Sequence, residues 1–195
     1  MNDSHYPLSV RRFHWLVFVL LTLVLILIYA HGWSPKGSAM RAVFKWAHIQ
    51  FGIAILLMMI PRIMARLRGE RPRIAPPPPS WQQWLARIVQ FALYALLFAV
   101  PLLGIANRLW SPSDWNFLGI ALPHVPVTDK AFSKQLEDIH GTLGNVLMYL
   151  AGAHAAIGLA HHFILRDSAL RAMLPFWGNA NTAGSAETNT NSANP

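Results

Sequence analysis

Histidine is concentrated in one long apolar stretch of this sequence. Residues 139–165 contain no Asp, Glu, Lys or Arg, yet they hold four of the chain's nine histidines: His140, His154, His161 and His162. A titratable side chain at membrane depth is costly and by default indicates function. On a helix, His140 and His154 lie on nearly the same face, about 21 Å apart along the axis. Imidazole binds metals, so this spacing suits two metal centres stacked across a membrane.

Two further histidines can supply the opposing ligands. His14 opens the first apolar segment and His48 lies near the start of the second. If the chain crosses the membrane four times, His14 reaches the depth of His154, and His48 reaches the depth of His140. Two bis-imidazole sites at two depths predict two haems. Haem iron with both axial positions filled transfers electrons rather than binding oxygen.

His161 competes with His154 for the pairing with His14. It follows His154 by seven residues and lies on nearly the same face, at a depth close to that of His14. Because about 10 Å separates the two positions on a helix, only one of them can serve a haem on that side. Spacing alone leaves the choice open. His162 points to another face and is expected to reach the interface.

Composition points to a membrane protein. The 195 residues are 54% hydrophobic and only 12% charged, whereas soluble domains have about 25% charged residues. The net charge of +8 does not require a nucleic-acid partner, because the Arg residues flank apolar segments. The chain has no cysteine. This excludes disulfides, Cys-ligated iron–sulfur clusters and covalent CxxCH haem, so any haem is b-type.

The apolar segments predict an all-α integral membrane four-helix bundle. The helices are expected at about 12–32, 40–67, 84–107 and 134–165. The third helix contains no histidine and completes the bundle. The bundle domain spans 12–175, after an N-terminal arm at 1–11. The Pro-rich connector at 68–80 reads as extended chain, and the small polar tail at 176–195 is predicted to be disordered.

Basic residues predict the orientation. Ten of the sixteen Lys and Arg residues fall on the side that holds both chain termini, so both termini are expected in the cytoplasm. The other side carries Lys36, Arg41 and Lys45, which can concentrate a small anion. A solvated loop that touches lipid phosphates is an equally good explanation of each of these residues alone.

Small residues follow the histidines. A flat macrocycle needs room against a helix, and Gly and Ala give it. Ordinary helix packing would use the same residues, so they support the haem prediction without establishing it. The glycines concerned are Gly52, Gly141, Gly144, Gly152 and Gly158.

These features together resemble the bacterial cytochrome b561 family, the small four-helix dihaem cytochromes of the inner membrane. The resemblance covers about residues 8–175. Its matching elements are FHWLVF at 13–18, HIQFGIAILLMMIPRIMARL at 48–67, the run from HGTLGN to LRD at 140–167, and LRAMLP at 170–175.

The resemblance implies that His14, His48, His140 and His154 are the axial ligands of two haems b. It therefore favours His154 over His161. It also implies ubiquinone as a partner, and in close members superoxide is oxidised at the periplasmic face. His161 and the adjacent His162 are then either interfacial polar groups or proton and quinone contacts.

The sequence thus predicts an oxidoreductase of the superoxide:quinone type in the bacterial inner membrane. The expected partners are membrane lipid, quinone, and superoxide or another small electron donor; a homodimer is also allowed. The first alternative is a cytochrome b subunit that relays electrons between quinone and a partner dehydrogenase or hydrogenase, which would dock on the loop at 108–137. The second, of another class, is a haemless transporter or metal-handling protein.

Overall fold

Four long helices make up most of the chain. The computed structural model describes residues 5–69 and 79–174. Each helix is long and apolar enough to cross a membrane, which agrees with the predicted all-α membrane bundle. The extended connector and the disordered tail predicted from the sequence fall largely or wholly outside the described residues. The helices are α1 (Leu8–Trp33), α2 (Ala39–Arg68), α3 (Ser80–Trp110) and α4 (Lys130–Phe163).

The helices extend beyond their apolar runs. α1 begins at Leu8 rather than near residue 12, α3 at Ser80 rather than near 84, and α4 at Lys130 rather than near 134. The apolar run marks the part of a segment that lies in the hydrocarbon core of the bilayer. The helical backbone hydrogen bonds continue through the flanking polar residues until a capping residue ends the helix. At α4 this cap is Asp129, whose carboxylate accepts from the amides of Ala131 and Phe132 at 2.8 and 3.0 Å. Such a cap satisfies amides that have no partner within the helix.

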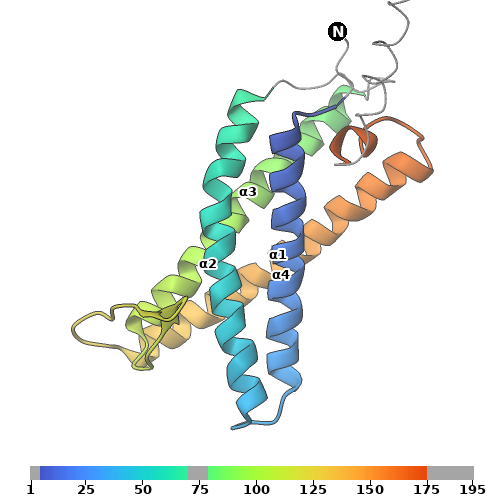
Figure 1. Cartoon of the computed structure of the whole chain (residues 1–195). Coiled ribbons are helices and arrows are strands. Elements are labelled where there is room, and N and C mark those ends of the chain that lie inside the picture. Colours follow the sequence, from blue (N-terminus) through green and yellow to red (C-terminus); the bar gives the residue numbers. More distant parts are fainter. Residues whose placement is uncertain (1–4, 70–78, 175–195) are drawn as a thin grey trace, which may run out of the picture.

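The helices pack as two antiparallel pairs. α1 lies along α2, α3 lies along α4, and α2 also packs against α3 (Figure 1). α4 crosses behind the first pair at a large angle in this view. Many large apolar side chains face outward, as expected where the surroundings are lipid. The shared core lies midway along the bundle and consists of Val17, Val24, Ile55, Met59, Leu97, Val100 and Leu147.

The start of α1 and the segment after α4 meet at one end, here called the terminal end (Figure 1). A short 3₁₀ helix, η1 (Arg171–Met173), lies there. The Tyr6 amide donates to the Ala172 carbonyl at 3.1 Å. Trp15 and the buried Arg11 donate side-chain N–H groups to the carbonyls of Met173 and Leu174, at 2.8 and 2.6 Å. These bonds fix the segment after α4 against α1.

The opposite end, here called the hairpin end, holds the α1–α2 loop and a small β-hairpin. Its strands are β1 (Asn116–Phe117) and β2 (Ile120–Ala121). Gln50 of α2 is buried and clamps this hairpin. Its amide donates to the Asn116 carbonyl and its Oε1 accepts from the Leu118 amide, both at 2.8 Å. Because Gln50 lies two residues after His48, the hairpin is held close to a predicted ligand.

Candidate haem sites

The four predicted ligands form two pairs between different helices. His48 of α2 faces His140 of α4, with ring centres 6.0 Å apart and ring planes at 85°. We call this the hairpin-end pair. His14 of α1 faces His154 of α4, with ring centres 6.4 Å apart and ring planes at 68°. We call this the terminal-end pair. One helix, α4, therefore contributes to both pairs.

These separations suit a metal ion bound between two imidazoles. A metal–imidazole bond is about 2.0 to 2.1 Å, and the ring centre lies about 1.1 Å behind the bonded nitrogen, so two imidazoles that bound one ion from opposite sides would have ring centres about 6.2 to 6.4 Å apart. Both pairs are within a few tenths of an ångström of this range. Each pair is therefore spaced so that it would hold one metal ion between its two rings without a large backbone movement.

Backbone carbonyls orient the hairpin-end pair. Nδ1 of His48 lies 3.1 Å from the Val24 carbonyl of α1, and Nδ1 of His140 lies 2.9 Å from the Val100 carbonyl of α3. A carbonyl can only accept, so both rings donate through Nδ1–H and keep the lone pair on Nε2. Metal-binding histidines usually show this arrangement. All four helices thus build this site.

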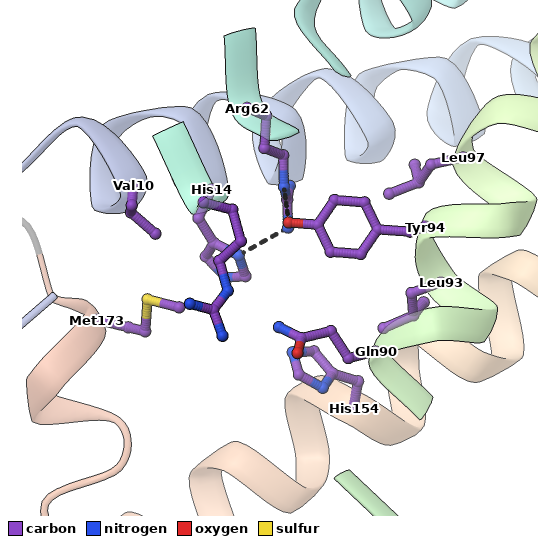
Figure 2. A pocket seen from close by; sticks show the side chains of 10 residues that line it. Val10, His14, Arg62, Gln90, Leu93, Tyr94, Leu97, His154 and Met173 are labelled. Carbon is purple, nitrogen blue, oxygen red and sulfur yellow. Dashed lines mark hydrogen bonds between the residues drawn. The ribbon is translucent and has the colours of Figure 1, made fainter. Parts of the chain in front are cut away.

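The terminal-end pair lines a pocket that is partly open to the surroundings (Figure 2). His14 is half-buried, and its Nδ1 lies 3.1 Å from a guanidinium nitrogen of Arg62. Because arginine only donates, this Nδ1 accepts a hydrogen bond here. His154 is exposed on the pocket wall. The pocket lining comprises Val10, His14, Arg62, Arg66, Gln90, Leu93, Tyr94, Leu97, His154 and Met173.

His161 contacts Asp167 rather than His14. Its Nδ1 lies 2.5 Å from a carboxylate oxygen of the buried Asp167. The Asp167 amide in turn donates to the His161 carbonyl at 3.1 Å, so the pair closes the turn after α4. His162 packs edge-on against Phe163, and its buried Nδ1 has no hydrogen-bond partner among the described residues. The structure therefore brings His154, and not His161, to His14.

Comparison with known proteins identifies the family. The family model described as prokaryotic cytochrome b561 matches residues 5–176. The chain belongs to the prokaryotic cytochrome b561 family. It is similar to cytochrome b561 homolog 1 of Escherichia coli K12, with 33% identity over 162 residues that cover 83% of this chain and 92% of the relative.

Two further relatives align over most of both chains. The probable superoxide oxidase CybB of Yersinia pestis is 33% identical over 162 residues, covering 83% of this chain and 91% of the relative. Cytochrome b561 homolog 2 of Escherichia coli K12 is 30% identical over 190 residues, covering 89% and 93%. Cytochromes b561 bind b-type haem and transfer electrons. The second alternative, a haemless transporter or metal-handling protein, is therefore wrong.

A residue that the sequence did not single out shapes the hairpin-end site of this cytochrome b561. Gly104 of α3 lies one turn after Val100, on the same face. A Cβ at this position would lie 3.1 Å from Cε1 and 3.3 Å from Nδ1 of His140. The missing side chain thus lets the ring reach the Val100 carbonyl. By contrast, Gly52, Gly141, Gly144, Gly152 and Gly158 have nothing within 4 Å of an added Cβ.

Gly104→Ala is expected to weaken the hairpin-end site selectively. The added methyl requires the His140 ring to shift by a few tenths of an ångström, which strains its hydrogen bond to the Val100 carbonyl. Complete loss of such an orienting contact costs about 10- to 100-fold in metal affinity, so the effect is expected to stay within that range. Alanine otherwise favours a helix over glycine by about 1 kcal/mol. Gly32→Ala, in α1 with open space around it, is the matched control and should retain all haem. Haem content and spectra of both purified variants measure the effect; normal haem content in Gly104→Ala would contradict it.

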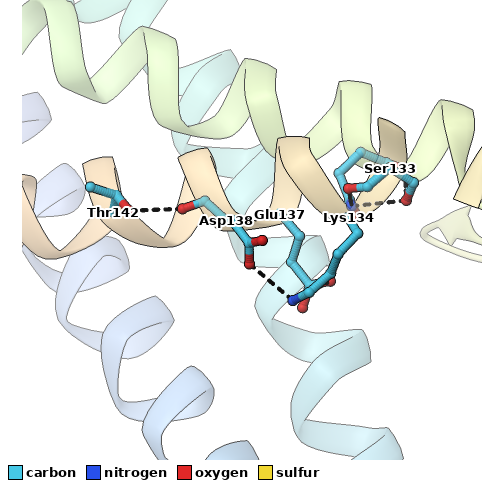
Figure 3. A network of polar contacts seen from close by, with 6 residues as sticks. Ser133, Lys134, Glu137, Asp138 and Thr142 are labelled. Atoms are coloured by element: carbon cyan, nitrogen blue, oxygen red, sulfur yellow. Dashed lines mark hydrogen bonds and ion pairs between the residues drawn. The ribbon is translucent and has the colours of Figure 1, made fainter. Parts of the chain in front are cut away.

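The Lys and Arg side chains of the hairpin end differ in the hydrogen bonds and ion pairs that they make within the chain. Arg41 donates to the carbonyls of His31 and Ser34 at 2.7 and 2.9 Å and so caps the end of α1. Lys134 pairs with Asp138 at 3.0 Å and Glu137 at 3.6 Å (Figure 3). Lys36 and Lys45 are exposed. Within the described part of the chain neither makes an ion pair or hydrogen bond, so they are free to meet an anion.

Proposed function

We propose that this cytochrome b561 holds two haems b, one between His48 and His140 and one between His14 and His154. The ring-centre distances of 6.0 and 6.4 Å support this assignment. The backbone hydrogen bonds of the hairpin-end pair support it independently, because they leave Nε2 of both rings available as a ligand.

We further propose that the protein oxidises superoxide and reduces ubiquinone. Two superoxide anions each give up one electron and become oxygen, and one ubiquinone takes up both electrons with two protons to become ubiquinol. Bound haem iron supplies the one-electron chemistry by cycling between its ferric and ferrous states. The observation that carries the proposal is the placement of two ligand pairs at two depths of one bundle, joined by α4.

The chain's own residues orient the haem ligands and attract the electron donor. The carbonyls of Val24 and Val100 hold the hairpin-end imidazoles in one tautomer and one orientation. The exposed Lys36 and Lys45 raise the local concentration of an anionic donor. The similarity to a relative named probable superoxide oxidase points to the same donor.

The proposed location is the bacterial inner membrane, with the terminal end in the cytoplasm and the hairpin end in the periplasm. The Arg-rich flanks of the terminal end support this orientation. Superoxide would then arrive from the periplasm, and ubiquinone from the lipid phase. A homodimer stays a prediction.

A kinetic assay separates this function from that of a relay subunit. Purified protein in lipid is mixed with a superoxide source and a soluble ubiquinone, and ubiquinol formation and haem reduction are followed by absorbance. We expect rapid haem reduction by superoxide and stoichiometric ubiquinol, with no other subunit present. Haems that ubiquinol reduces and superoxide does not, together with a co-purifying dehydrogenase or hydrogenase, would instead establish the relay function.

A further inference from the structure

Arg62 holds a positive charge inside the bundle at the terminal-end site. It lies six residues before the end of α2, about 9 Å along the helix from that end. A guanidinium nitrogen is 3.1 Å from Nδ1 of His14, Nε is 3.5 Å from the Tyr94 hydroxyl, and the guanidinium carbon lies 5.3 Å from the Tyr94 ring centre. Figure 2 shows the side chain between these two residues, at the wall of the pocket.

The described chain offers Arg62 no carboxylate. α1, α2 and α3 contain no acidic residue, and the two in α4, Glu137 and Asp138, lie near the hairpin end. Asp167 follows α4 but is engaged by His161. A charge at this depth is costly without a counter-ion. Its partner is therefore expected to be a ligand rather than a side chain of the described segments.

Ligation would release Arg62 from His14. A neutral imidazole that binds a metal through Nε2 carries its proton on Nδ1, which then donates and cannot accept from a guanidinium. The planar N–H fork of arginine would be left facing the pocket, and it matches a carboxylate with two parallel hydrogen bonds. Haem b carries two carboxylates. A lipid phosphate fits less well, because Arg62 lies about 9 Å before the end of α2 and lines the pocket within the bundle.

We propose that Arg62 binds a carboxylate of the haem held by His14 and His154, and raises its reduction potential above that of the hairpin-end haem. This inference rests on the proposed function. A nearby positive charge favours ferrous over ferric iron, whereas the Nδ1–H bonds to carbonyls make His48 and His140 stronger donors that favour ferric iron. Electrons would then move downhill from the hairpin end to the terminal end.

Redox titration of the intact cytochrome tests the potential. Arg62→Gln is expected to lower the reduction potential of the terminal-end haem by about 59 mV. For a one-electron couple this equals an about tenfold fall in the ferrous-to-ferric ratio at a given applied potential. Arg62→Lys keeps the charge and should stay near wild type. Arg68→Gln removes an exposed arginine at the end of α2 and is the matched control. Unchanged potentials in Arg62→Gln, or an equal shift in Arg68→Gln, would overturn the inference.

Haem with esterified carboxylates tests the contact itself. Haem-depleted protein is reloaded with haem b or its dimethyl ester, and both binding steps are titrated. Wild type should hold the ester about tenfold more weakly at one site, and Arg62→Gln should not distinguish the two. Equal affinities in wild type would overturn the contact, as would loss of the terminal-end haem from both Arg62→Gln and Arg62→Lys. A wild-type protein with fewer than two haems would refute the proposed function instead.

Discussion

His48→Ala is expected to remove one haem and leave the other, and to reduce superoxide-driven ubiquinol formation to background. The substitution deletes one axial ligand of the hairpin-end pair, which faces His140 at 6.0 Å between ring centres. The terminal-end pair takes its two histidines from α1 and α4, neither of them His48, and should remain loaded. Haem-to-protein ratio and the reduced spectrum measure the loss.

The pairing makes a stricter prediction for the four ligands together. His140→Ala should remove the same spectral component as His48→Ala, and the double variant should lose no more haem than either single one. His14→Ala and His154→Ala should both remove the other component. His161→Ala, which breaks a contact with Asp167, is the control and should keep both haems. Full haem content in His48→Ala, or loss of a haem in His161→Ala, would show that the ligands are wrongly assigned.

Removal of two lysine charges is expected to slow the reaction with superoxide. In Lys36→Gln/Lys45→Gln the second-order rate constant for haem reduction should fall by about three- to tenfold at low ionic strength, because the anion is no longer concentrated at the hairpin end. The difference should narrow as salt approaches about 1 M, where the screening length is about 3 Å.

A double variant at the other end supplies the control for this experiment. Arg12→Gln/Arg68→Gln removes two exposed charges from the terminal end and should leave the rate unchanged. Stopped-flow absorbance at several salt concentrations compares the two variants. Equal effects of both, or an effect of the lysine variant that does not depend on salt, would rule out steering by Lys36 and Lys45.

Much of the fold could be predicted from the sequence because it depends on local patterns. Four apolar runs predict four helices, and the spacing of His140 and His154 predicts two depths on α4. The starts of α1, α3 and α4 each lie four residues before the predicted positions, since apolar runs do not report where backbone hydrogen bonding begins. The choice between His154 and His161 needed either the family resemblance or the Asp167 contact.

The details of the sites depend on how helices approach one another. Gly104 matters only because α3 brings the Val100 carbonyl to His140, and no spacing within α3 reveals this. Arg62 is one of the Arg residues that flank an apolar segment in the sequence, but the packing of α2 against α1 turns it toward His14. Arg41 reads as a free cation, yet two carbonyls at the end of α1 occupy it.

The reduced-minus-oxidised spectrum of the purified protein, combined with haem and protein quantification, tests the central claim most directly. Two bis-histidine sites predict a sharp b-type α-band after dithionite and two haems per chain, with the haem extractable because the chain has no cysteine. A single haem per chain, or no such α-band, would contradict the two-site account.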